Sequence, residues 1–154
     1  MRFAAIDTNL LLILIVGHVS IPHIKKHKRL RGYGPQDYDL LVNVLEKFQD
    51  LRVVTHAMAE VSNLLVYGVH EPLRSRFLAA LKVLVESGIE HHIPSDAAAG
   101  HPDFLRVGLT DAAWLESLDS ETFLLTDDAL LLHAALSRDL QAVRFSDLRS
   151  RFLV

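Results

Sequence analysis

The sequence predicts an α/β fold, a single-domain three-layer sandwich in which a central, mostly parallel sheet is flanked by helices. Short apolar segments alternate with longer segments whose apolar residues recur every three or four positions, and this alternation is typical of strand-helix-strand units. The chain has 154 residues, 50% of them hydrophobic, with only 7 Gly and 5 Pro. That length is typical of one domain with a substantial core. Because no linker-like stretch interrupts it, we expect one domain over 1–154.

The first strand is expected at 2–6 (RFAAI), and a leucine-rich helix follows from Leu10. Thr8 and Asn9 provide the side chains that usually cap a helix N-terminus. Proline, glycine and many cations then interrupt the pattern, so 18–34 is expected to be a loop.

The middle of the chain predicts a helix, a strand and a second helix. Pro35 suits the first turn of a helix over 35–48, where apolar residues recur at helical spacing. The segment LRVVT at 51–55 is typical of a strand, and the helix expected over 57–67 ends at Gly68.

The last third repeats the alternation. A helix is expected at 74–86, a strand at 89–93 and an irregular segment with one or two short turns at 94–108. The remaining expected elements are a helix over 110–118 capped by Thr110, a strand at 122–125, a helix over 128–138, a strand at 142–145 and a helical turn at 146–149.

Composition excludes several functional classes. The chain has no cysteine, which excludes disulfides, cysteine-bound metal and a thiol nucleophile. Its 16 Lys and Arg against 19 Asp and Glu give a net charge of -3, so a nucleic acid would have to bind a local patch. The longest apolar run, 10–16, is far shorter than the roughly 20 residues of a membrane-spanning helix. We therefore expect a cytoplasmic protein with no membrane partner.

Acidic residues recur where predicted strands give way to helices. Asp7 follows the first strand, Glu60 lies early in the helix after LRVVT, Asp111 follows Thr110, and Asp127 and Asp128 follow the strand TFLL. The carboxyl ends of parallel strands meet at one edge of a sheet, where ligands bind. Carboxylates gathered there would repel one another and raise one another's pKa. A divalent cation relieves that repulsion, and an all-oxygen site suits Mg²⁺ or Mn²⁺.

Each acid also has a plain structural interpretation. A single Asp at a helix start, such as Asp111 or Asp128, is most often a cap. Glu60 resists this interpretation best, because it lies within AMAEVSNLLV, where a solvated face is hard to draw. The recurrence of acids at one topological position favours a metal site over four separate caps.

Four sequence blocks carry a family resemblance: AIDTNLLL, THAMAEVSNLL, GLTDAAWLE and LLTDDALL. In order, spacing and strand context the chain resembles the PIN-domain ribonucleases of bacterial and archaeal toxin-antitoxin systems. The resemblance covers nearly the whole chain. It implies a PIN-like fold and metal-dependent endonucleolytic cleavage of single-stranded RNA. Asp7, Glu60, Asp111 and an acid of the last block would hold the cation.

The fourth acid is ambiguous. The family pattern of Thr, any residue, Asp selects Asp128, and Asp127 would then bind an outer water or cap the helix. By the same resemblance, Asn9 and Thr126 would orient the carboxylates, with ordinary turn or cap roles as the alternative. A cognate antitoxin and a homodimer are further implied partners.

Two other classes fit the acidic pattern less completely. A receiver-like signalling domain needs an Asp after the third strand and a Lys after the fifth, and HHIPSD and VRFSD fit these requirements poorly. A catalytically inactive PIN-like scaffold for RNA or protein binding would keep the same residues without turnover. The sequence reveals residues that could bind a metal, but it does not reveal whether the protein is catalytically active, so this alternative stays open.

The segment between the first two helices is strongly basic. It could guide a phosphate backbone toward the acids, or it could be a solvated loop. His23 and His27, or His91 and His92, are weaker candidates for a metal pair, the second because alternation in a strand sends them to opposite faces. The cations of this basic segment are Lys25, Lys26, Lys28, Arg29 and Arg31.

The surplus of apolar residues in the whole chain suggests a dimer or antitoxin surface.

Overall fold

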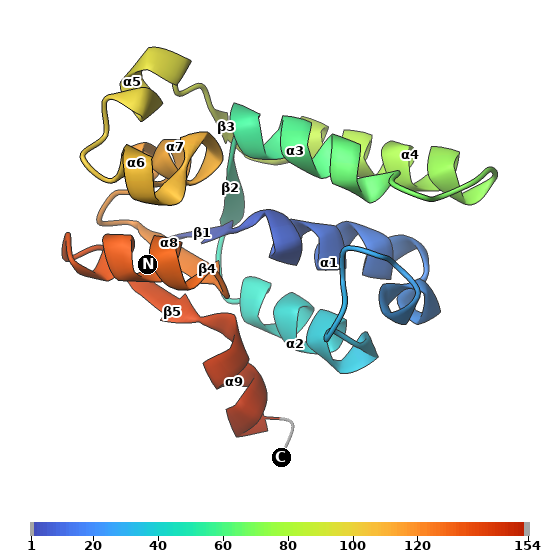
Figure 1. The fold of residues 1–154 in the computed structure, drawn as a ribbon. Coiled ribbons are helices and arrows are strands. Elements are labelled where there is room, and N and C mark those ends of the chain that lie inside the picture. The colour runs from blue at the N-terminus through green and yellow to red at the C-terminus, as the bar shows by residue number, and fades with distance from the viewer. Residues whose placement is uncertain (1, 153–154) are drawn as a thin grey trace.

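Five strands form one sheet in the order β3-β2-β1-β4-β5, and every neighbouring pair is parallel. The computed structural model describes residues 2–152. Helices flank the sheet, with α1 to α4 on one side in Figure 1 and α5 to α8 on the other. The predicted α/β class with a parallel central sheet is confirmed. The strands are β1 (Phe3–Ile6), β2 (Asp50–Val54), β3 (Ile89–His91), β4 (Thr122–Thr126) and β5 (Ala142–Arg144).

The central strand β1 is buried along its whole length, as expected for a parallel strand covered on both faces. Its last residue, Ile6, pairs with Leu125 of β4. On its other side β1 pairs with β2. The last residues of β2 and β3, Val54 and His91, pair with each other. The carboxyl ends of the strands therefore lie along one edge of the sheet.

The helices join the strands in the predicted order. The apolar run after Asp7 forms α1, whose buried residues lie on all sides of the helix, and α1 contacts α2, α3 and α4. A helix that is apolar all round is typical of a protein core. Within residues 2–152, no helix is both long and apolar enough to cross a membrane. The helices are α1 (Thr8–Val19), η1 (Ile21–Lys25, a 3₁₀ helix), α2 (Pro35–Leu45), α3 (Thr55–Leu65), α4 (Leu73–Ser87), α5 (Ser95–Ala99), α6 (Phe104–Val107), α7 (Leu109–Ser117), α8 (Ala129–Leu136) and α9 (Phe145–Phe152).

Two predicted helix caps are wrong. The N-cap of α1 is Asp7, whose Oδ1 accepts a hydrogen bond of 3.0 Å from the Leu10 N–H, so Thr8 and Asn9 already lie inside the helix. The N-cap of α7 is Gly108, which has a φ of 85°, a value that favours glycine. Thr110 therefore lies in the first turn, and its hydroxyl is free to bond elsewhere.

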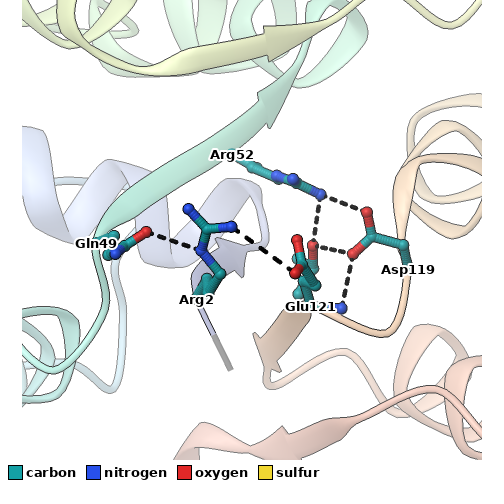
Figure 2. A network of polar contacts seen from close by, with 6 residues as sticks. Arg2, Gln49, Arg52, Asp119 and Glu121 are labelled. Atoms are coloured by element: carbon teal, nitrogen blue, oxygen red, sulfur yellow. Dashed lines mark hydrogen bonds and ion pairs between the residues drawn. The ribbon is translucent and has the colours of Figure 1, made fainter.

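Arg52, on β2, binds side chains just before and at the start of β4 (Figure 2). Its Nη1 donates to Asp119 Oδ2 at 2.6 Å and to Thr122 Oγ1 at 2.9 Å, and its guanidinium carbon lies 3.8 Å from the centroid of the Phe3 ring. Burial raises the pKa of Asp119, but the hydrogen bonds from Arg52 and Thr122 outweigh it and hold the pKa below its usual value. Arg2 adds a bond to Gln49 nearby (Figure 2).

Candidate metal centre

Asp7 is held at the end of β1 by three donors. Besides Leu10, the Asp127 N–H donates to Oδ2 at 3.2 Å, and the Thr126 hydroxyl makes a short hydrogen bond to the same oxygen. The side chain is only 6% exposed. Burial raises the pKa of Asp7, although these hydrogen bonds oppose the rise. Asp7 is thus a fixed carboxyl group with little solvent around it.

Thr126 links Asp7 to the fourth acidic block. Its hydroxyl donates to Asp7 and accepts a 2.9 Å bond from the Asp128 N–H, and the residue is fully buried. Asp128 is the N-cap of α8, where its Oδ1 accepts from the N–H groups of Leu130 and Leu131. The predicted orienting role of Thr126 therefore has a structural basis, and the cap interpretation of Asp128 is correct for one of its two oxygens.

Asp127 binds residues from two other segments of the chain. Its Oδ2 accepts from the Tyr33 hydroxyl at 2.7 Å, and its Oδ1 accepts from the Ser146 N–H at 2.7 Å. The pKa of Tyr33 is raised by burial and by this bond to Asp127. Because both oxygens serve these contacts, Asp127 ties α9 and the segment before α2 to the sheet. It does not cap α8, and Asp128 is the better candidate for the fourth ligand.

Asp111 shows that the remaining acids lie close together. Its pKa is raised to about 7, first by burial and then by the negative charges of Asp128, Asp7 and Glu60 and by hydrogen bonding with Asp128. These four acids come from four segments of the chain: the end of β1, α3, α7 and the start of α8. Asp111 therefore lies within electrostatic range of the three other acids that the sequence predicts as ligands.

Glu60 differs from the sequence-based expectation in one respect. It is exposed and lies on a solvated face of α3, whereas the apolar stretch around it predicted no such face. The reason is that the apolar neighbours Ala57, Met58 and Val61 all turn into the core on the opposite side of the helix. The Glu60 Oε2 accepts a 2.8 Å bond from the Thr110 hydroxyl, which fixes α3 to α7.

Within the part of the chain that the structure describes, the acids of the cluster have no ion-pair partner, whereas some acids elsewhere are paired with arginine. Asp37, Asp103 and Asp119 each have an arginine nitrogen within 4.0 Å. Among the ion pairs found in residues 2–152, none involves Asp7, Glu60, Asp111, Asp127 or Asp128. Four acids near one another without a cationic side chain suit a divalent cation in charge and in donor type.

The side chains do not stand in ligand geometry. Across residues 2–152, no three His, Asp or Glu side chains converge closely enough to hold a metal ion as placed. The bonds described above explain this, because Leu10, Thr110 and the start of α8 each hold a carboxylate oxygen. Metal binding would require side-chain rotation, above all of the exposed Glu60 and Asp128.

Several contacts of this site could not be read from the sequence. Tyr33 and Ser146 join it from positions that look like a loop and a terminal turn, and no residue pattern marks them. Thr110 is visible as a polar residue, but its usual cap role conceals its bond to Glu60. Asn9 is exposed, and within the described chain no hydrogen bond joins its side chain to Asp7.

The chain matches no known family model, and no curated protein matches it either. The fold and the site define a class: a parallel α/β protein with a cluster of acids at the carboxyl edge of its sheet that have no ion-pair partner within residues 2–152.

Proposed function

We propose that this protein is a Mg²⁺- or Mn²⁺-dependent endoribonuclease of the PIN-domain type that hydrolyses single-stranded RNA. The observation that carries the proposal is the cluster around Asp111. Burial and the charges of Asp128, Asp7 and Glu60 raise the pKa of Asp111 to about 7, and these four acids have no ion-pair partner within residues 2–152. The parallel sheet, which places ligands at its carboxyl edge, supports the same conclusion.

Asp7, Glu60, Asp111 and Asp128 would hold the cation, which supplies a water of lowered pKa and neutralises charge on the phosphate. In the reaction, a water oxygen attacks phosphorus, one P–O ester bond breaks, and the leaving oxygen takes a proton. The residues of this chain orient the groups: Thr126 and the backbone fix the Asp7 carboxyl, and Tyr33 fixes Asp127. No side-chain nucleophile and no covalent intermediate are needed.

The test is cleavage of a fluorescent single-stranded RNA by the full chain in Mn²⁺ or Mg²⁺, with EDTA as the reference. We expect Asp7→Asn and Asp111→Asn to lower the rate by at least about 100-fold, because loss even of a ligand's supporting partner costs up to that factor. Glu116→Gln is the matched control, since Glu116 is an exposed acid on the same helix as Asp111. Wild-type cleavage by Asp7→Asn would refute the mechanism.

The second candidate is a catalytically inactive PIN-like scaffold that binds RNA or protein. The lack of three converging ligand side chains in residues 2–152 favours it. RNA binding without cleavage in either metal would support this alternative. A role as the toxin of a toxin-antitoxin system, a cognate antitoxin and a homodimer remain proposals that rest on the sequence resemblance.

A further inference from the structure

The basic segment between α1 and α2 is a built surface. Its buried side chains include Ile24, His27 and Leu30, which are 0%, 2% and 0% exposed. They recur every third residue, the period of a 3₁₀ helix, and they begin in η1. The cations between and beside them, Lys25, Lys26, Lys28, Arg29 and Arg31, are all exposed. The segment therefore presents its charges from an anchored backbone.

His27 supplies the main anchor. Its Nε2 donates to the Leu65 carbonyl at 3.0 Å, at the end of α3, and its Nδ1 accepts from the Arg29 N–H at 3.2 Å, which assigns the proton to Nε2. Its ring also lies against those of His23 and Phe77. Both ring nitrogens are in use, which leaves neither of them for a metal.

An exposed aromatic ring lies beside the cations. Tyr67 is 53% exposed, and Lys28 Nζ and Arg29 Cζ lie 5.8 and 5.1 Å from its ring centroid. No ion pair within residues 2–152 engages any of the five cations of the segment. Surfaces that bind single-stranded nucleic acids combine two elements: cations that follow the phosphate backbone and aromatic rings on which the bases stack.

This surface is linked to the carboxylate cluster through two residues near its members: Leu65 on the helix of Glu60, and Asp127 beside Asp128. Leu65, which accepts the His27 bond, follows Glu60 by five residues on α3, or about 8 Å along the helix. At its other end the segment reaches Tyr33, which donates to Asp127. Lys25 and Tyr33 also line a pocket of about 360 Å³ with Arg149. A strand lying on the cations could therefore continue into the cluster.

We propose that residues 25–31 and Tyr67 form the surface that holds a single-stranded RNA next to the carboxylate cluster. The cations bind phosphates, and the Tyr67 ring stacks on an unpaired base. An exposed ring favours a single strand, because bases in a duplex are already stacked. The proposal rests on the proposed function, since it names the part of the protein that positions the substrate.

Binding is measured separately from cleavage. Fluorescence anisotropy follows a labelled single-stranded RNA of roughly ten nucleotides titrated with the full chain in EDTA. In Lys28→Ala/Arg29→Ala we expect Kd to rise at least about tenfold and the slope of log K against log salt to shrink by about 1.4. The control is Arg74→Ala/Lys82→Ala, two exposed cations on α4, which should leave Kd unchanged.

Variants of Tyr67 test the stacking contribution. Tyr67→Ala should weaken binding about 5- to 100-fold, whereas Tyr67→Phe should keep wild-type affinity because its ring still stacks. A purely structural Tyr67 would predict a lower melting temperature with unchanged Kd. Lys26→Glu and Arg31→Glu test the same surface at two further exposed positions, in case the first double variant fails to fold.

The outcomes for binding and for cleavage are distinct. Wild-type Kd in the Lys28→Ala/Arg29→Ala, Lys26→Glu and Arg31→Glu variants would overturn the surface, and so would tighter binding of a duplex than of the single strand. If RNA binds through these residues but no metal supports cleavage, the surface stands and the enzymatic proposal fails. If cleavage occurs, the double variant should raise KM while kcat stays close to wild type.

Discussion

Asp111 is the residue at which the crowding of carboxyl groups has a measurable energetic consequence. Its pKa is raised from 3.8 to about 7, first by burial and then by its acidic neighbours. Between these two values the folded state binds more protons than the unfolded chain. The free energy of unfolding in EDTA should therefore fall as pH rises from about 4 to about 7, by up to about 4 kcal/mol.

Asp111→Asn should remove the contribution of Asp111 to this pH dependence and leave that of Asp7, whose pKa burial also raises. In EDTA near pH 8 we expect the variant to be more stable than wild type by about 2 to 4 kcal/mol, and to lose that advantage below about pH 4. Urea denaturation at several pH values measures the effect. Glu116→Gln should retain the wild-type profile, and an Asp111→Asn profile parallel to wild type would show that Asp111 is not the titrating group.

Thr126 connects two of the acids through one buried hydroxyl. Thr126→Val keeps the shape but removes one of the three donors to Asp7 and leaves the Asp128 N–H without its acceptor. We expect a loss of about 1 to 3 kcal/mol in the free energy of unfolding, the usual cost of an unsatisfied buried polar group. Thr126→Ser should restore most of it. Equal stability of the Val and wild-type proteins would contradict the contacts described for this hydroxyl.

The residues of the site differ in how far sequence could predict them. Asp7 and Asp128 follow the ends of β1 and β4, so topology alone places them at one edge, whereas Asp111 reaches it through α7, after α5 and α6. Tyr33 reaches Asp127 across 94 positions of the chain. Such a contact depends on how the segment before α2 packs, which no local pattern encodes. Cap assignments failed for a related reason, because Thr110 bonds to Glu60, 50 positions away, and not to its own helix.

At the scale of elements, the order of strands and major helices was predictable because burial imposes a period on each of them. The short elements were less predictable. The segment 94–108, expected to be irregular with one or two short turns, contains the short helices α5 and α6, and the expected loop 18–34 contains η1. Each is about one turn long, too short for a periodic pattern to separate it from a loop. The three-residue spacing of Ile24, His27 and Leu30 was the available signal for the second of these.

Gly17 shows how packing between elements reverses a local preference. Ala is favoured over Gly inside a helix by about 1 kcal/mol. At this position of α1, however, an added Cβ would lie 2.2 Å from Tyr38 Cδ2 on α2, with the ring Cγ at 2.5 Å. We expect Gly17→Ala to destabilise the protein by about 1 to 3 kcal/mol, measured by urea denaturation.

A second variant identifies the cause. Tyr38→Ala removes the ring, so Gly17→Ala introduced into that background should no longer destabilise, and the two changes should be strongly non-additive. A Gly17→Ala penalty that is the same in both backgrounds would place the cost elsewhere in α1.

For the whole molecule, the net charge of -3 conceals a separation of charge. Unpaired acids gather at the carboxyl edge of the sheet, while five of the cations lie together on the segment between α1 and α2. Many of the apolar residues fill the core, including those on all sides of α1, and a dimer or antitoxin surface stays a prediction. Among the large apolar residues whose exposure the structure describes, Leu105 is the most exposed, at 95%.

Stability of the whole fold should respond to the cation that the cluster is proposed to hold. A ligand that binds only the folded state adds about 2.7 kcal/mol when present at 100 times its Kd. For a chain of this length we expect saturating Mn²⁺ to raise Tm by roughly 5 to 10 °C. Protons compete with the metal for the same oxygens, and Asp111 has a pKa of about 7, so the rise should be larger near pH 8 than near pH 5.5. Differential scanning calorimetry measures it. Asp7→Asn should abolish the rise and Glu116→Gln should keep it; an equal rise in both variants would mean that Mn²⁺ binds away from the cluster.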